Sequence, residues 1–534
     1  MHFEGWIAVQ QDTEASSASA VPESGLSTSA LPRNGTRWPW DTIAVGVLAF
    51  VLIAAGSNKP GFSGDELVTV SASTRSLSDL WVMLQAVDGH QAFYYFFMHI
   101  WHAIFPITEF TTRLPSLIAV GLAAAGVVVL GKQISTKTVA ITAGVVFALL
   151  PRVTATLDAR PYAITMAIAV WLTIYCVTAS RREERWRWPV YAVLLALATV
   201  FNLHLFLIAP AHAVAVRQFA STPGAFRKWA LATAGALAVL VPYVMLAKSK
   251  FPGAWIPPLS WNTASKVFED QYFGAEHKVD PTAVSLLAGA ILIAGLVIGL
   301  RSGARRPTGL VALALTWVAV PTLCLLALSI IDPIYVPRYL SFTAPGLALL
   351  LGLCITKIGR NQVGIVVVLA LFAVAAAPVY LAQRNKRPVG QDYKQAAEVI
   401  NRYAAPGDCL LIADSGFDYW SPKQRRWPPL RSMLIPEPSA YVKLVDPGLI
   451  PSTGFFNGTK PVADWADQLA GCPAIWTLTD RDNTLPNYQK GQALPVGPRL
   501  QDSDSYKLPS QLGFRVVERW QSKSGLTQVT KSTR

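Results

Sequence analysis

Long apolar runs alternate with short polar segments over residues 39–382. The first run, "WDTIAVGVLAFVLIAAG", begins at Trp40. A helix needs about 17–25 mostly apolar residues to cross a bilayer, and most of the runs approach this length. We therefore expect an all-α polytopic membrane bundle of about 11–13 spans. After the first, the predicted spans cover residues 113–131, 139–151, 161–179, 189–216, 230–247, 283–300, 310–331, 340–356 and 363–382.

Two segments leave the number of spans open. "AFYYFFMHIWHAIFP" is short and carries His99 and His102, so it either spans the membrane or lies half-inserted. "WPVYAVLLALATVFNLHLFLIAPAHAVAV" is long enough for one span, or for two short spans that turn at Asn202, Leu203 and His204.

Composition agrees with a membrane protein, and charge indicates its topology. Hydrophobic residues make up 52% of the 534 residues and charged residues 15%, with a mean hydropathy of +0.36. The net charge of +14 comes from basic clusters such as "RREERWR" and "RSGARR" between the apolar runs. Basic loops stay in the cytoplasm, so the charge reports topology and does not indicate a nucleic-acid partner.

Composition and the positive-inside rule together divide the chain into three parts. Residues 1–38, rich in Ser, Ala, Thr and Pro, are expected to form a disordered cytoplasmic tail. Residues 39–382 form the membrane domain, with outer loops at 57–91, 154–162, 248–282 and 332–339. Residues 383–534 follow as an extracytoplasmic α/β domain with an amphipathic helix "DYKQAAEVINRYAAPGD", short buried strands "CLLIAD" and "PAIWTLTD", and a hairpin over "FRVVERWQSKSGLTQVTKS". Cys409 and Cys472 lie near strand edges of this domain, either as a disulfide or as two independent buried thiols.

Candidate chemistry gathers in the first outer loop. "GFSGDELVTV" places Asp65 and Glu66 side by side among Gly and Ser, where an extended loop would turn them to opposite sides. One of the pair would serve as a base, and the other as a metal ligand or a structural acceptor. Downstream, "TRSLSDLWVMLQAV" predicts a helix lying on the membrane, with one apolar face formed by Leu77, Leu80, Trp81, Leu84 and Val87.

Asp88 and His90 follow this helix directly, in "DGHQAFYYF". A carboxylate and an imidazole at this level could hold a divalent metal ion. The alternative is a helix N-cap aspartate with a surface histidine.

Several short motifs stand in a specific order: "GDE" after the first span, the interfacial helix, "YYF", "TRLPSLIAVGLAAAGVVVLGK", "DARPYAI" and a late "PRYL". In this order the chain resembles the GT-C superfamily of polyprenyl-phosphate-sugar glycosyltransferases. Similar arrangements occur in protein O-mannosyltransferases, in the aminoarabinose transferase that modifies lipid A, and in actinobacterial mannosyl- and arabinosyltransferases of the cell envelope. The resemblance covers roughly the first two thirds of the chain and the "QDYKQAA" junction.

The resemblance implies roles for individual residues. The first-loop carboxylate Asp65 would be the catalytic base, with Glu66 beside it, and Asp158 in "DARPY" matches the second acidic position. Asp88 matches a position where some members have a metal ligand. Several relatives have Pro-Pro where this chain has Gln91 and Ala92, so the resemblance leaves dependence on a divalent metal open.

Transfer from a lipid-phosphate sugar also requires positive charge on the phosphate that leaves. Arg160 and Arg338 can each offer bidentate guanidinium donors, and Tyr162 and Tyr339 beside them can add hydroxyl donors or stack on a sugar. The alternative for each arginine is an interfacial anchor to lipid phosphates. His204 belongs either to the donor site or to the packing of the bundle.

We therefore expect an inverting glycosyltransferase of the plasma membrane that uses a polyprenyl-phosphate sugar donor. The motifs favour mannosyl transfer to a cell-envelope lipoglycan or glycolipid over arabinosyl transfer. A polytopic lipid or sugar transporter or flippase is the rival class, but it would carry ionisable residues at mid-membrane or broken spans in repeated halves. A third alternative is a non-catalytic relative that binds envelope glycans through its C-terminal domain.

Overall fold

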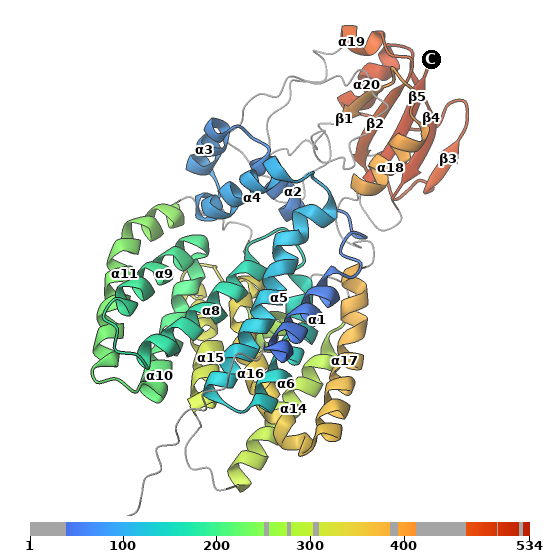
Figure 1. The fold of residues 1–534 in the computed structure, drawn as a ribbon. Coiled ribbons are helices and arrows are strands. Elements are labelled where there is room, and N and C mark those ends of the chain that lie inside the picture. The colour runs from blue at the N-terminus through green and yellow to red at the C-terminus, as the bar shows by residue number, and fades with distance from the viewer. Residues whose placement is uncertain are drawn as a thin grey trace, which may run out of the picture. The chain divides into compact units, whose positions relative to one another are not determined.

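The computed structural model describes residues 39–249, 256–274, 279–302, 309–384, 393–412, 466–498, 500–522 and 527–534. Figure 1 shows a set of long helices followed by a small sheet near the C-terminus. The predicted fold class, an all-α membrane bundle with a small C-terminal α/β domain, is confirmed. The predicted tail over residues 1–38 lies outside the described residues.

Seven helices in the described part of the chain are long and apolar enough to cross a membrane, and four apolar helices are shorter. This set makes the protein a multi-pass membrane protein. The long ones are α5 (Glu109–Ile134), α8 (Tyr162–Ser180), α11 (Ala225–Ser249), α14 (Thr282–Arg301), α15 (Gly309–Ser329), η4 with α16 (Pro337–Thr343 and Ala344–Gly359) and α17 (Gln362–Arg384). The shorter ones are α1 (Trp40–Ala54), α6 (Lys137–Leu149), α9 (Arg187–Phe201) and η2 with α10 (Leu203–Ile208 and Ala209–Phe219).

The segment around Asn202 takes the second of its two predicted forms, two short helices with a turn. The Asn202 side chain accepts a hydrogen bond from the His204 amide at 3.0 Å, which satisfies a backbone donor where the helix is broken. This break brings the ring of His204 close to η4, where it stacks on Tyr339 with 5.1 Å between centroids.

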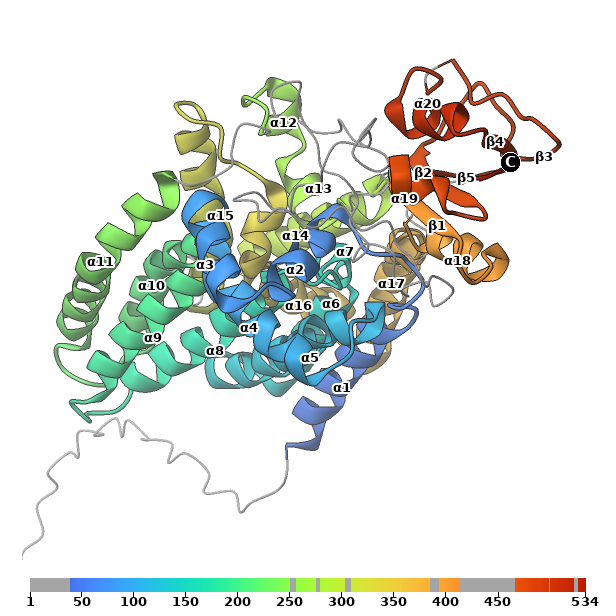
Figure 2. The ribbon, with the colours of Figure 1, turned by 90° about the horizontal axis from the view of Figure 1, so that it is seen from above.

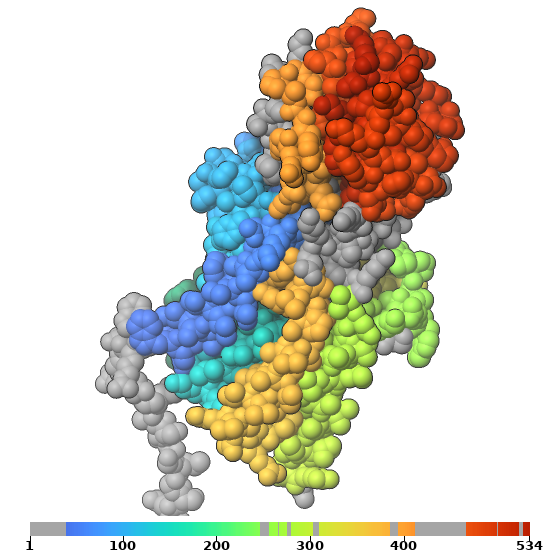
Figure 3. All heavy atoms as spheres, turned by 90° about the vertical axis from the view of Figure 1, so that its right-hand side faces the viewer, coloured from blue at the N-terminus to red at the C-terminus, as the bar shows by residue number. Residues whose placement is uncertain are grey.

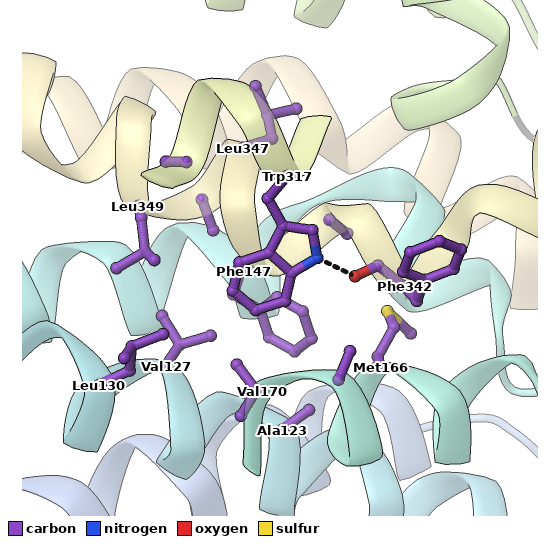
Figure 4. Close-up of a cluster of buried hydrophobic side chains, with 14 of the residues drawn as sticks. Ala123, Val127, Leu130, Phe147, Met166, Val170, Trp317, Phe342, Leu347 and Leu349 are labelled. Carbon is purple, nitrogen blue, oxygen red and sulfur yellow. Dashed lines mark hydrogen bonds between the residues drawn. The ribbon is translucent and has the colours of Figure 1, made fainter. Parts of the chain in front are cut away.

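The interior of the bundle is apolar and closely packed. Figure 2 places α16 near the middle of the helices and α11 at their margin, in agreement with the large difference in their burial. In Figure 4, Trp317 of α15 lies among Phe147, Met166 and Leu347, and its indole nitrogen donates to the Phe342 carbonyl at 3.1 Å. A buried indole with a satisfied N–H fixes the packing of several helices at once.

The outer helices turn apolar side chains away from this core. In Figure 3, α1, α17 and α14 run along one face of the molecule. Tyr380 of α17 donates to the Leu52 carbonyl of α1 at 2.7 Å, so these two helices are in direct contact. Exposed apolar side chains on α17, such as Leu371 and Val374, would face lipid in a bilayer.

Three short helices follow α1: α2 (Gly64–Ser73), α3 (Leu77–Ala86) and α4 (Ala92–Ile104). The predicted interfacial helix is α3, with Leu80 and Leu84 buried and Leu77 and Trp81 exposed. The helix α4 has 13 residues, and a helix of this length rises only about 20 Å, less than the hydrocarbon thickness of a bilayer.

The C-terminal domain is a five-stranded sheet in the order β1-β2-β5-β4-β3. β1 (Cys409–Ile412) is parallel to β2 (Ile475–Asp480), and the pairs of β2, β5 (Thr527–Thr533), β4 (Arg515–Gln521) and β3 (Tyr488–Lys490) are antiparallel. Both predicted strands and the predicted hairpin are confirmed. The domain also contains α18 (Tyr393–Tyr403), α19 (Ala466–Ala470) and α20 (Asp504–Gln511).

The two faces of this sheet have separate cores. Cys409 and Cys472 form a disulfide, with 5.8 Å between their Cα atoms, and pack with Ile475 and Phe514 on one face. Of the two alternatives predicted for these cysteines, the structure therefore has the disulfide. On the other face α18 covers Leu410, Trp476, Leu478 and Val529.

The core under α18 also includes two residues from the first outer segment of the membrane domain. Phe62 and Leu67 pack in the same hydrophobic cluster as Tyr393 and Trp476. Lys394 of α18 donates to the Asn58 carbonyl at 2.9 Å. The segment that leads into α2 is therefore packed against the C-terminal domain.

Candidate functional site

Asp65 lies in the first turn of α2. Ser63 caps this helix: its hydroxyl accepts from the Glu66 amide at 3.2 Å, and the Glu66 carboxylate accepts from the Ser63 amide at 2.8 Å. The prediction that Asp65 and Glu66 lie in a loop is wrong, because Ser63 and Glu66 have the spacing of a capping box. Successive helical residues point about 100° apart, so Glu66 turns inward while the Asp65 side chain stays 37% exposed.

Glu66 forms a buried, bidentate ion pair with Arg113 of α5. Arg113 Nε lies 2.7 Å from Oε1 and Nη2 lies 2.8 Å from Oε2, and neither side chain is exposed. Oε1 also accepts from the Ala159 amide at 3.1 Å. Arg113 donates further to the carbonyls of Pro60 and Gly61. Glu66 thus has the role of structural acceptor, one of the roles that the sequence left open for this pair.

Asp65 instead faces two arginines from distant parts of the chain. Arg160 Nη2 lies 3.1 Å from Oδ1, and Arg338 Nη2 lies 3.5 Å from Oδ2. Arg160 belongs to the turn before α8, and Arg338 belongs to η4. The structure therefore brings together three of the predicted site residues, with one carboxylate facing two guanidiniums.

Arg160 is buried and surrounded by acidic groups. Burial alone would lower the pKa of its guanidinium, but Asp65, Tyr95 and Asp88 raise that pKa well above its ordinary value. Its Nη1 donates to the Tyr95 hydroxyl at 3.0 Å. Its Nε is buried and has no acceptor among the described residues, and a buried orphan donor of this kind suits a site that takes an anionic ligand. Since Arg160 points inward to carboxylates, the interfacial-anchor alternative does not hold for it.

Aromatic rings line the Arg338 side of the site. The Tyr162 hydroxyl lies 3.3 Å from Arg338 Nε, and the Arg338 guanidinium lies 5.9 Å from the centre of the Tyr339 ring. Tyr339 in turn lies between Tyr162, at 6.3 Å, and His204, at 5.1 Å. The structure thus gathers all five predicted donor-binding residues, Arg160, Tyr162, His204, Arg338 and Tyr339, around one place.

Asp158 also lies at this site, beside the start of α2. Its Oδ2 accepts from the Ser63 hydroxyl at 3.4 Å, and its carbonyl accepts from Ser116 at 2.9 Å. This contact connects the turn that carries Arg160 to the cap of the helix that carries Asp65. A catalytic role of Asp158 stays a prediction.

Asp88 and His90 occupy the far side of Arg160. Asp88 is buried, has a left-handed backbone with φ of 58°, and accepts from the Tyr95 hydroxyl at 2.6 Å. His90 Nδ1 lies 3.7 Å from Asp88 Oδ1, and the His90 side chain is 14% exposed. Asp88 stands at the N-cap position of the short helix η1 (Gly89–Gln91), as the alternative expects, but its side chain makes no cap bond. The surface histidine of that alternative is wrong, because His90 is mostly buried.

These two side chains alone do not complete a metal site. No third His, Cys, Asp or Glu joins them within the described ranges. Arg160, a cation, approaches the same Tyr95 hydroxyl that binds Asp88. One carboxylate and one imidazole beside a guanidinium are too few ligands for a stable divalent site. The roles of Asp88 and His90 as metal ligands stay a prediction.

Sequence reasoning missed two residues of this network. Arg113 begins an apolar run and looks like the flank of a span, although its carboxylate partner stands in the "GDE" motif. Tyr95 stands in "AFYYFF", where its apolar neighbours conceal a buried hydroxyl that joins Asp88 to Arg160. The only available signal was the position of "YYF" two residues after "DGHQ".

Comparison with known proteins supports the fold. No known family model and no curated protein sequence matches the chain. The chain is similar to the crystal structure of ArnT from Cupriavidus metallidurans bound to undecaprenyl phosphate, with 14% identity and a TM-score of 0.51 over 92% of this chain and 97% of that chain. The apo state of the same protein gives 12% identity and a TM-score of 0.50 over the same shares. The chain therefore shares the fold of this ArnT over nearly its whole length.

Proposed function

We propose that this protein is an inverting glycosyltransferase that uses a polyprenyl-phosphate sugar as donor. The observation that carries the proposal is the Asp65 carboxylate held between Arg160 and Arg338, at 3.1 and 3.5 Å. ArnT, which shares the fold, was crystallised with undecaprenyl phosphate. A carboxylate and two guanidiniums are the groups that a reaction with a hydroxyl acceptor and a phosphate leaving group requires.

In this proposal the donor phosphate binds Arg160 and Arg338 in place of Asp65. A phosphate can accept two guanidiniums at once, and the buried Nε of Arg160 supplies a further donor. Tyr162 orients Arg338 through its hydroxyl, and the rings of Tyr339 and His204 contact the sugar. Release from the two arginines leaves the Asp65 carboxylate available to accept a proton.

The reaction is then a single displacement. Asp65 takes the proton of the acceptor hydroxyl as that oxygen bonds to the anomeric carbon, and the bond between this carbon and the phosphate oxygen breaks. The electron pair leaves with the lipid phosphate, whose charge Arg160 and Arg338 stabilise, so the leaving group needs no proton. A β-linked donor gives an α-linked product.

We infer mannose as the sugar, because the sequence motifs are most similar to those of mannosyltransferases, and a lipoglycan or glycolipid of the cell envelope as the acceptor. The positive-inside pattern supports a site at the outer face of the plasma membrane, with the N-terminus in the cytoplasm and the C-terminal domain outside.

The test is transfer of labelled sugar in membranes from polyprenyl-phosphomannose and, separately, from polyprenyl-phosphoarabinose. We expect Asp65→Asn to reduce transfer at least about 100-fold, the usual contribution of a general base. Asp79→Asn, at an exposed carboxylate on α3, is the matched control and should transfer like the wild type. Equal transfer in both variants would refute the role of Asp65, and the donor that is used identifies the sugar. A parallel series with a chelator shows whether a metal is needed.

A further inference from the structure

Two exposed aromatic side chains of the C-terminal domain lie together. Within the described part of this domain, Tyr403 and Tyr488 are the only large apolar side chains that are exposed, at 45% and 54%. They come from the end of α18 and from the edge strand β3, yet both contact the ring of Trp520. The ring centroids lie 5.2 Å apart for Tyr403 and 5.9 Å apart for Tyr488. Two independent elements thus present rings at one spot.

The rings continue from this spot into the domain. Trp520 stacks on Trp476 at 5.5 Å with an angle of 20° between the rings, and Tyr403 is inclined by only 21° to Trp520. Trp476 is fully buried under α18. We call Tyr403, Tyr488, Trp520 and Trp476 the aromatic row. Its outer rings are exposed, and its inner ring is fixed in the core.

Polar groups border the exposed end of the aromatic row, and two of them, Glu518 and Lys490, form an ion pair. Glu518 accepts from the Tyr488 hydroxyl at 3.3 Å and from Lys490 Nζ at 3.2 Å. Arg402 lies over the Tyr403 ring at 5.5 Å. The Glu518 carboxylate and the Lys490 ammonium neutralise each other, so this pair does not favour an anionic ligand over a neutral one. Apolar ring faces beside hydroxyl and carboxylate groups match a neutral ligand with many hydroxyls.

The inner end of the aromatic row reaches the segment that carries the proposed base. Trp476 packs in the cluster that includes Phe62 and Leu67, which flank Asp65 in the chain. Lys394 of α18 holds the same region through the Asn58 carbonyl and through Glu109, both at 2.9 Å. The aromatic row therefore belongs to the domain whose helix α18 packs against the residues that lead into α2.

From this arrangement we propose that the aromatic row is a binding subsite for a neutral glycan, the extended part of the acceptor. The proposal rests on the proposed function, because it assigns the occupant as the chain that receives the sugar. The C–H faces of a sugar ring stack on Tyr403, Tyr488 and the exposed edge of Trp520, while Glu518 and the Tyr488 hydroxyl bind sugar hydroxyls. The subsite holds a growing glycan close to the membrane without taking part in bond formation.

Binding is measured with the full-length protein in detergent and two probes, a fluorescent mannan oligosaccharide and a fluorescent arabinan oligosaccharide. We expect the wild type to bind one of them, and Tyr403→Ala and Tyr488→Ala each to weaken that binding about tenfold, the size of one aromatic contact. Tyr488→Phe keeps the ring and is the matched control, with binding within about threefold of the wild type. Equal binding in the alanine variants, or no binding of either probe to the wild type, would overturn the proposal.

A second measurement separates this proposal from the proposed function. Asp65→Asn should bind the oligosaccharide like the wild type, because it changes no residue of the aromatic row. In transfer assays Tyr488→Ala should raise KM for a long glycan acceptor and leave transfer to a monosaccharide acceptor unchanged. If Asp65→Asn still transfers sugar while Tyr488→Ala loses glycan binding, the catalytic assignment fails and the subsite stands. Both tyrosines are exposed, so thermal unfolding of their alanine variants should match that of the wild type.

Discussion

Replacing Glu66 with Gln tests whether the buried pair with Arg113 holds the segment that carries the proposed base, Asp65. The carboxylate accepts four hydrogen bonds, two at each oxygen: from Arg113 Nε and the Ala159 amide at Oε1, and from Arg113 Nη2 and the Ser63 amide at Oε2. An amide has only one accepting oxygen. Whichever way Gln is oriented, two of the four donors therefore face its NH₂ group, and one of them belongs to the guanidinium.

The expected effect is large because Arg113 stays buried and charged. Removing one partner of a buried ion pair costs about 3–5 kcal/mol, and the backbone carbonyls that Arg113 also contacts cannot neutralise its charge. We therefore expect Glu66→Gln to lower the free energy of unfolding by about 3–5 kcal/mol. Asp65→Asn changes the next residue, whose side chain is 37% exposed, and should lower it by about 1 kcal/mol or less.

Chemical denaturation in detergent micelles measures both variants on the same scale. The two substitutions should then have different effects: Glu66→Gln mainly loses stability, and Asp65→Asn mainly loses sugar transfer. If Glu66→Gln unfolds at the same denaturant concentration as the wild type, the burial and bidentate pairing of Glu66 cannot be correct. A loss of stability in Asp65→Asn as large as that in Glu66→Gln would also refute the division of roles.

Three further results are expected. Arg338→Lys keeps the charge but loses the planar fork, so it should raise KM for the lipid donor about tenfold in the transfer assay, and an unchanged KM would exclude a contact with the phosphate. Burial, with Arg160 acting in the same direction and Asp88 against it, lowers the pKa of His90 below 6.5. As pH falls through 6.5, His90 therefore takes up a proton in the unfolded chain before it does in the folded protein, and the folded protein loses stability. His90→Gln should reduce the drop in the free energy of unfolding between about pH 7.5 and about pH 5.5. An identical drop in the variant and the wild type would refute this. The disulfide from Cys409 closes a loop of 63 residues, so Cys409→Ser should destabilise the C-terminal domain by about 4 kcal/mol, and a reducing agent should affect the wild type but not this variant.

The sequence predicts the membrane helices well because lipid imposes a simple rule. A spanning helix must be apolar along its length, so the run at residues 161–179 coincides almost fully with α8, Tyr162–Ser180. The sequence predicts the helix break at Asn202 less clearly, because a polar residue within an apolar run is compatible with one span or with two. The side chain of Asn202 decides this locally, by accepting from the backbone where the helix ends.

The site was predictable in its residue types and not in its pairings. Asp65, Arg160 and Arg338 stood out as charged residues in outer loops, but no local pattern shows that the two arginines meet one carboxylate. The same limit applies to Glu66, whose inward turn depends on Arg113 from another helix. Pairings between elements far apart in the chain are set by tertiary packing, which hydrophobic periodicity does not describe.

The packing of Phe62 and Leu67 into the core under α18 has a consequence for the order of synthesis. The contact between Asn58 and Lys394 joins residues 336 positions apart, and chains are made and inserted from the N-terminus. The segment carrying Asp65 is therefore made long before its packing partner in α18 exists. During that interval Phe62 and Leu67 lack the apolar partners that bury them in the full chain. The packing of this segment is therefore completed only after α18 has been made.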